Sequence, residues 1–188
     1  MKKLLCMFAV CVLAATSLSA TVGWEFGVGS GYMYYGSSET RARNRQISDA
    51  NQILLHANAG TLFKLAPALY FCFGVDTMTD FRWKGSDHVN SLDYAAVMGF
   101  HLYPGLSGLM FSTEYALGRR TDFVSINNAD DETIHSTQWG NGFKFALAYD
   151  FAKEGVGLAP AVGASWRHMP RGGSSDEIIA VFIRLSEK

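Results

Sequence analysis

The chain has 188 residues, of which 48% are hydrophobic, and its formal net charge is −1. This length corresponds to one domain, and the near-neutral charge gives no reason to expect a nucleic-acid partner. After residue 20, no apolar stretch approaches the roughly 20 residues that a membrane-spanning helix needs, which excludes a helical membrane protein.

Residues 1–20 have the organisation of a secretory signal peptide. Lys2 and Lys3 precede the apolar segment Leu4–Ala15, and small residues then lead to Ala20, where we expect cleavage. The alternative, an N-terminal anchor helix, is disfavoured because the apolar segment is too short to span a bilayer. The sequence therefore predicts a signal peptide at 1–20 and one exported domain at 21–188.

Cysteine usage predicts a mature domain without disulfides. Cys6 and Cys11 lie within the predicted signal peptide, and Cys72 alone remains after its removal. A single cysteine cannot form an intrachain disulfide. The fold must then depend on burial and hydrogen bonding.

The first mature segment, Val22–Tyr35, alternates between two kinds of side chain. Trp24, Phe26 and Val28 occupy one set of alternate positions, whereas Glu25 and several glycines occupy the other. A period of two describes a β-strand, whose successive side chains point to opposite faces. One bulky apolar face and one small or charged face are typical of a strand between lipid and a narrow polar lumen.

The same alternation recurs seven more times along the chain. The further segments are Asn51–Lys64, Leu69–Trp83, Ser91–Tyr103, Leu109–Arg119, Thr137–Phe151, Leu158–His168 and Ile178–Leu185. A strand of about 9–11 residues tilted near 45° crosses a bilayer, and only a closed barrel satisfies every backbone group there. The sequence predicts an all-β protein, an eight-stranded antiparallel up-and-down transmembrane β-barrel.

The connections alternate in length. Short turns are expected at 66–68, 104–108 and 152–157, and longer polar loops at 36–50, 84–90, 119–136 and 169–176. Outer-membrane barrels place their short turns in the periplasm and their long loops outside the cell. We therefore expect both termini in the periplasm and the protein in the outer membrane of a diderm bacterium.

The glycines decide which face is lipid-exposed. A soluble eight-stranded barrel such as a lipocalin would turn its apolar face inward. Here the glycines share a face with the strand charges, and the opposite face carries too many large side chains for a narrow interior. We therefore expect the apolar face outside, against lipid. All four tryptophans fall at or near strand ends, as in an interfacial aromatic girdle: Trp24, Trp83, Trp139 and Trp166.

The inward face carries acids and bases that must pair in a narrow lumen, because an unpaired buried charge is costly. The candidate lumen network is Glu25, Asp76, Glu114, Lys144, Arg167 and Arg184. We interpret it as a plug that closes the barrel. The alternative is a gated polar pore.

Three other patterns bear on binding chemistry. Arg41, Arg43 and Arg45 form a small basic group in the first loop, which predicts a solvated tip or a contact with lipid phosphates or host surfaces. The acidic run Asn127–Glu132 fits no defined calcium loop and predicts a solvated tip. The glycines at 27–31 lack the spacing of a dinucleotide motif. We expect no metal and no cofactor.

Together, the signal peptide, the eight alternating strands, the aromatic girdle and the loop asymmetry resemble the small eight-stranded outer-membrane proteins (the OmpA-barrel, OmpX and OmpW-like group). The composition is also similar to that of predicted small barrels of spirochaetes. One departure is the C-terminus, because such chains commonly end on an aromatic residue and this one ends Leu185–Lys188. By the expected register, Phe182 faces inward.

The resemblance implies a structural or surface-interaction role, with outer-membrane lipid, the assembly machinery and host surface molecules as partners. The second possibility is an OmpW-like channel for small, hydrophobic solutes. The third is a lipid A-modifying enzyme, because some small barrels are deacylases with a His-x-Ser pair in the seventh strand. Here His168 is followed by Pro170 at the serine position, so we expect no enzyme.

Overall fold

The computed structural model describes residues 22–106, 108–127, 132–151 and 157–188. The predicted signal peptide and most of the acidic run near residue 130 lie outside this part of the chain. The described elements are β1 (Val22–Tyr34), α2 (Ser38–Gln46), β2 (Asn51–Ala66), β3 (Leu69–Lys84), β4 (Asp87–Leu102), η1 (Pro104–Leu106), β5 (Leu109–Ser125), β6 (Thr133–Ser136), β7 (Gly140–Asp150), β8 (Ala159–Arg171) and β9 (Ser174–Glu187).

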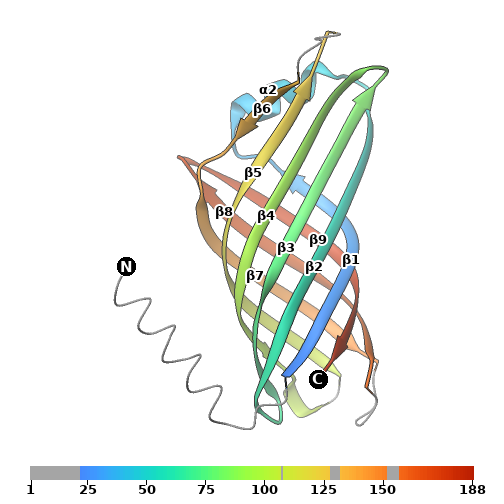
Figure 1. The fold of residues 1–188 in the computed structure, drawn as a ribbon, viewed down its shortest axis with the longest axis vertical. Helices are drawn as coiled ribbons and strands as arrows, with labels where there is room; N and C mark the ends of the chain where they lie inside the picture. The colour runs from blue at the N-terminus through green and yellow to red at the C-terminus, as the bar shows by residue number, and fades with distance from the viewer. Residues whose placement is uncertain (1–21, 107, 128–131, 152–156) are drawn as a thin grey trace.

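Eight of these strands close into an antiparallel barrel (Figure 1). Neighbours in sequence pair around the wall, β5 pairs with β7, and β1 pairs with β9 to complete the circle. The pairing of β1 with β9 begins near the C-terminus, where Trp24 lies opposite Glu187. The predicted eight-stranded barrel is confirmed.

The two faces of the wall have opposite character. On β5, for example, Met110 and Glu114 are buried inside the barrel, whereas Phe111, Tyr115 and Leu117 are exposed outside. A protein in water buries its large apolar side chains, so this inverted arrangement fits a barrel whose outer surface meets hydrocarbon. Phe182 is 7% exposed and faces inward, as the predicted register of the last strand required.

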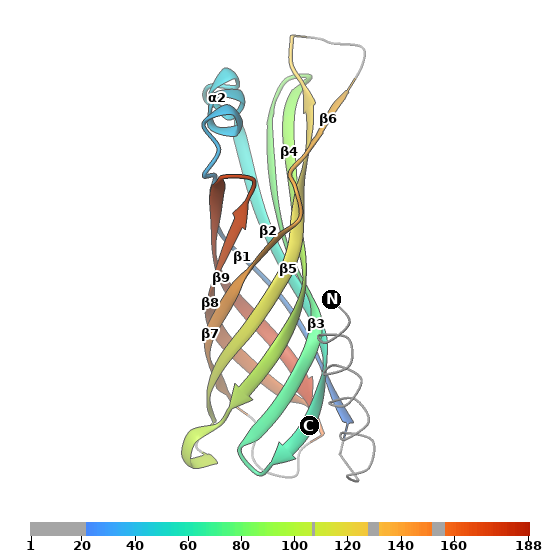
Figure 2. The ribbon, with the colours of Figure 1, turned by 90° about the vertical axis from the view of Figure 1, so that its left-hand side faces the viewer.

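The barrel wall is not level at the loop end. β2, β3, β4 and β5 extend beyond the hairpin of β8 and β9, and α2 lies above that shorter side (Figure 2). The opposite end carries the C-terminus and the short connections between β2 and β3 and between β4 and β5 (Figure 1). The barrel therefore presents one projecting wall of strands on its loop side.

Two expected loops are tight hairpins, so the prediction of long loops at 84–90 and 169–176 was wrong. Lys84 pairs with Asp87 across a two-residue turn, and Arg171 pairs with Ser174 across Gly172 and Gly173. Both turns begin on a glycine with positive φ, 62° at Gly85 and 53° at Gly172, which the short hairpin turns require. The outward positions of these strand ends, such as His88, Asn90 and Ser175, carry no large apolar side chains, so the period-two signal fades there although the backbone pairing continues.

The two remaining loops contain regular structure. In the first, α2 begins after Ser37, whose side chain accepts a hydrogen bond from the backbone N–H of Thr40 as an N-cap. In the other, β5 continues to Ser125 and pairs with the short strand β6. Among the described residues, no helix is both long and apolar enough to cross a membrane.

Candidate functional site

The most distinctive feature of the barrel is its charged interior. Because alternate residues of every barrel strand point inward, polar side chains from all sides of the wall meet in one narrow space. The charged residues buried there are Glu25, Asp76, Asp80, Asp93, Glu114, Arg120, Asp122, Lys144, Asp150, Arg167, Arg171, Asp176 and Arg184.

Near the C-terminal end of the barrel, two carboxylates flank a histidine. Arg184 Nη1 lies 2.9 Å from Glu25 Oε2, and His101 Nδ1 lies 3.7 Å from the same oxygen. On its other side, His101 Nε2 lies 3.3 Å from Glu114 Oε1, which also accepts a hydrogen bond of 2.8 Å from the Ser112 hydroxyl. His101 therefore connects the carboxylates of β1 and β5 across the lumen.

At mid-barrel, two cations converge on Asp76. Lys144 Nζ lies 2.8 Å from Asp76 Oδ2 and 3.4 Å from Glu114 Oε2, and Arg167 Nη1 lies 3.2 Å from Asp76 Oδ1. His56 Nε2 is 3.0 Å from Asp76 Oδ2. Asp76 thus links β3 to β7 and β8, which are not its neighbours in the wall.

Toward the loop end, arginines and aspartates alternate. Asp93 accepts a hydrogen bond from Arg167 and forms an ion pair with Arg171, each at 2.6 Å. Arg171 also pairs with Asp176 at 2.7 Å, and Arg120 pairs with the same carboxylate. Arg120 Nε lies 2.9 Å from Asp122, which Arg43 of α2 reaches at 3.3 Å. The chain of contacts ends on the helix above the shorter side of the barrel.

We call this continuous series the ion-pair ladder. In order from the C-terminal end, it consists of Arg184, Glu25, His101, Glu114, Lys144, Asp76, Arg167, Asp93, Arg171, Asp176, Arg120, Asp122 and Arg43. Buried charges are costly unless paired, and removal of one partner leaves the other uncompensated. The ladder is therefore a set of mutually dependent contacts along the length of the lumen.

Apolar side chains fill the interior around the ladder. One cluster packs Leu62, Met110 and Phe182 with Tyr70 and Tyr103 near the C-terminal end, where the two tyrosine rings meet edge to face. A second cluster at the loop end is centred on Met33, Met78 and Ile178. The two tyrosines thus face the lumen instead of joining the outer aromatic girdle.

The structure brings all six residues of the predicted lumen network into the ladder. Sequence reasoning did not assign the other seven ladder residues to the network, nor His56, which contacts Asp76 beside the ladder; the seven are Arg43, Asp93, His101, Arg120, Asp122, Arg171 and Asp176. The strand pattern predicts that the two histidines face inward, but nothing in it shows which carboxylate a histidine will meet. Arg171 and Asp176 were missed because residues 169–176 were expected to form a loop.

The three arginines of the first loop have different surroundings. Arg41 donates two hydrogen bonds to the backbone carbonyls of Tyr35 and Gly36, at 2.6 and 2.8 Å, and Arg43 turns inward to Asp122. Of the three, Arg45 alone is exposed. Arg41 and Arg43 therefore attach α2 to the barrel, and Arg45 faces solvent.

The four tryptophans point outward at different heights along the barrel. Trp139 contacts Tyr94, which lies opposite Arg119, and Trp83 lies on β3 well beyond that level toward the loop end. Trp24 donates its indole N–H to Glu187 at 2.6 Å near the C-terminus. Trp83 therefore lies on the projecting wall, and the aromatic girdle stays a prediction.

The enzyme-like histidine has no serine at the expected position. His168 Nδ1 lies 2.5 Å from Glu177 Oε1 on the outer face, beside Trp166, whose N–H donates to the same carboxylate at 2.8 Å. Pro170 occupies the position where a deacylase carries its nucleophile. His168 and Glu177 thus resemble the base and the carboxylate of a catalytic triad, but the serine that would complete it is replaced by Pro170.

Burial shifts the pKa of two groups that lie directly after the last residue of a strand. Burial raises the pKa of Tyr35 well above its usual value, and the Tyr35 hydroxyl donates to Asp80 at 2.6 Å. Burial also lowers the pKa of Lys188, although its ammonium pairs with Asp150.

No family model matches the chain, and no curated protein matches its sequence. Its structure is similar to that of Neisserial surface protein A, with a TM-score of 0.54, 11% identity and coverage of 88% of this chain and 97% of that one. It is also similar to Ail, the attachment invasion locus protein of Yersinia pestis. One Ail structure gives a TM-score of 0.56 at 7% identity, with 88% of this chain and 97% of Ail covered.

A second Ail structure, in complex with the heparin analogue sucrose octasulfate, gives a TM-score of 0.60 at 6% identity, covering 90% of this chain and 99% of Ail. At such low identities the likeness concerns the fold alone. The closed eight-stranded wall, the inverted burial and these structures together establish that the chain has the fold of the small outer-membrane β-barrel proteins.

Proposed function

We propose that this protein is an integral outer-membrane barrel with a closed lumen, which acts through its loop side in a structural or surface-interaction role. The observation that carries the proposal is the ion-pair ladder. It crosses the lumen repeatedly, from Arg184 on β9 to Arg43 on α2. Export by a signal peptide cleaved after Ala20 belongs to the same proposal.

The ladder supports a plug more than a pore because its steps between charged side chains are largely buried ion pairs, and His101 bridges two buried carboxylates. Passage of solute past Asp76 would require separating it from both Lys144 and Arg167. Breaking a buried pair typically costs about 3–5 kcal/mol. The apolar clusters around Leu62 and Met78, both fully buried, also support a plug.

Planar-bilayer recording tests the closed lumen. We expect the reconstituted wild-type protein to be electrically silent, and the double variant Glu114→Ala with Lys144→Ala to remain silent or to conduct only in rare openings. Steady wild-type conductance that the double variant alters in size or selectivity would replace the plug with the alternative, an OmpW-like channel for small solutes. Heat-modifiable gel mobility of each sample shows that the barrel is folded.

The loop side supports a contact surface. β5 with β6 and the hairpin of β3 and β4 project there, and Arg45 and Lys84 are exposed on it. The solved complex of Ail with a heparin analogue makes a sulfated host glycan the first partner to test. Such a ligand is held by charge-assisted hydrogen bonds from arginine and lysine.

Heparin binding to nanodisc-embedded protein tests this partner. We expect measurable retention at low salt that Arg45→Ala with Lys84→Ala weakens severalfold. Lys64→Ala is the matched control, because Lys64 is also exposed but lies near the short turn of β2 and β3, at the opposite end. Equal retention of all three proteins would exclude a loop-side site for sulfated glycans.

Incubation of the folded protein with lipid A tests for enzymatic deacylation. The position of Pro170 leads us to expect no released acyl chains. Release that disappears in a His168→Ala variant would contradict the non-enzymatic proposal.

A further inference from the structure

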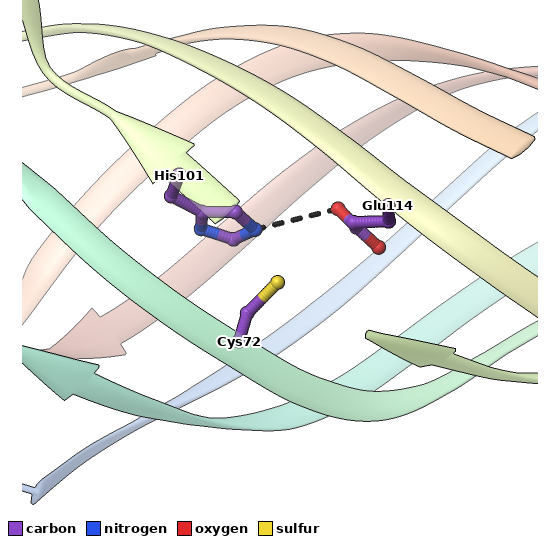
Figure 3. A group of neighbouring side chains, drawn as sticks. All are labelled: Cys72, His101 and Glu114. Atoms are coloured by element: carbon purple, nitrogen blue, oxygen red, sulfur yellow. Dashed lines mark hydrogen bonds and ion pairs between the residues drawn. The ribbon is translucent and has the colours of Figure 1, made fainter. Parts of the chain in front are cut away.

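We propose that Cys72, His101 and Glu114 form a zinc-binding site inside the barrel. The sulfur, imidazole nitrogen and carboxylate oxygen of the three side chains all lie within 4.8 Å of one another, and each residue is buried. Figure 3 shows the Cys72 sulfur directed toward the space between His101 and Glu114. The proposal concerns metal chemistry and is independent of the role suggested above.

The three donors meet because they lie on neighbouring strands. Cys72 of β3 pairs with Gly99 of β4, and Gly99 pairs with Glu114 of β5. Cys72 and Glu114 therefore lie on either side of Gly99 in the sheet. A Cβ at Gly99 would lie only 2.0 Å from the Thr113 carbonyl oxygen. Glycine therefore brings the strands close and leaves no side chain between Cys72 and Glu114. His101 approaches from two residues farther along β4.

The spacing of the donors suits a tetrahedral ion. His101 Nε2 and Glu114 Oε1 are 3.3 Å apart, which is long for a charge-assisted hydrogen bond. Two ligands bound to zinc at about 2.0–2.1 Å with a tetrahedral angle are separated by roughly 3.3 Å. An ion could therefore be bound by both atoms with little movement of either strand.

Two of the three donors, His101 and Glu114, have polar neighbours of the kind that surround metal ligands. His101 Nδ1 is buried, has no hydrogen-bond partner among the described residues, and lies 3.7 Å from Glu25 Oε2. A small approach of this carboxylate would let it accept a hydrogen bond from Nδ1, the arrangement that leaves Nε2 for the metal in histidine sites. Glu114 is held by Ser112 on one oxygen and by Lys144 on the other, and Arg184 holds Glu25.

The donor set selects the class of metal. Calcium and magnesium take oxygen ligands, whereas a thiolate with an imidazole favours zinc and related transition metals. Three protein ligands leave one tetrahedral position for water or a solute, as in open zinc sites. Binding converts the Cys72 thiol to a thiolate and releases its proton to solvent, so affinity should rise with pH.

Cobalt substitution tests the site. The full-length mature protein is refolded in detergent with excess Co²⁺, so that the metal enters before the barrel closes, and free metal is then removed. We expect about one cobalt per chain, a near-ultraviolet thiolate-to-cobalt absorption band, and visible bands of tetrahedral intensity that Zn²⁺ abolishes. Heat-modifiable mobility is recorded on the same samples.

Two variants and one control make the result specific. We expect Cys72→Ala to lose the thiolate band and His101→Gln to reduce bound cobalt at least tenfold. His56→Gln is the matched control, because His56 is another buried lumen histidine paired with a carboxylate, Asp76. It should retain the metal. A folded wild-type barrel with no thiolate band, or a band that persists in Cys72→Ala, would overturn the proposal.

Discussion

Lys144 on β7 and Asp76 on β3 meet across the lumen, with 2.8 Å between Nζ and Oδ2. The two strands are separated in the wall by β4 and β5. The pair therefore connects opposite sides of the barrel, and both side chains are almost completely buried. Its consequences for stability follow from the cost of an uncompensated buried charge.

Lys144→Ala should destabilise the barrel strongly, because Glu114 loses its lysine partner and Asp76 loses one of its two cations. We expect a decrease of about 3–5 kcal/mol in the free energy of unfolding, measured by urea titration in lipid vesicles. Lys64→Ala is the matched control and should change stability by less than about 0.5 kcal/mol, since Lys64 is exposed. Equal midpoints for the two variants would show that the central ion pairs contribute little.

Gly31→Ala should loosen the junction between β1 and β9. A Cβ at this position would lie 1.9 Å from the Ile179 carbonyl oxygen, so the two backbones would have to separate. We expect a loss of about 1–3 kcal/mol, as for other overpacked sites. Gly157→Ala offers the comparison, because a Cβ there would have no heavy atom of the described residues within 4 Å. If both variants melt alike in the gel-shift assay, the close approach is not limiting.

Thr40→Val should release α2 from the barrel. The Thr40 hydroxyl accepts from Arg120 Nη2 at 2.8 Å and from Arg43 Nη2 at 3.3 Å, and valine preserves the shape without the acceptor. We expect trypsin to cleave after Arg43 and Arg45 severalfold faster in the folded variant. Ser38→Ala, at an exposed position of the same helix, should leave the cleavage rate unchanged. The same rate in both proteins would mean that other contacts hold α2.

Tyr35 should make stability fall at alkaline pH. Because burial raises its pKa, the unfolded chain releases this proton near the ordinary value of about 10 while the folded protein still retains it. Stability is therefore fully present below about pH 10 and decreases as pH rises toward the folded pKa.

Tyr35→Phe separates this effect from the general alkaline loss. At pH 7 the variant should be less stable by about 1.5–3 kcal/mol, because the hydrogen bond to Asp80 is lost. Between pH 7 and 11 its stability should decrease less than that of the wild type. Tyr115→Phe, at an exposed outer position, is the control. A parallel decline in all three proteins would exclude Tyr35 as the source.

The chain's own pattern of residues was enough to predict the wall. Each strand separates lipid from lumen by itself, so its period-two alternation can be recognised without knowing which strands it pairs with. The number of strands, the face that meets lipid and the inward position of Phe182 could therefore be predicted from local sequence. Where the outward face lacks large apolar side chains, as at residues 84–90 and 169–176, the same reasoning failed to predict that the strands continue.

Only the tertiary structure decided which inward side chains meet. Asp76 could have paired with any cation on the inner face, and the strand tilt and register of the closed barrel brought it to Lys144, Arg167 and His56. Cys72, His101 and Glu114 likewise became neighbours through the pairing of β3, β4 and β5. A strand's sequence determines which face a residue occupies, but its neighbours across the lumen depend on how the whole sheet closes.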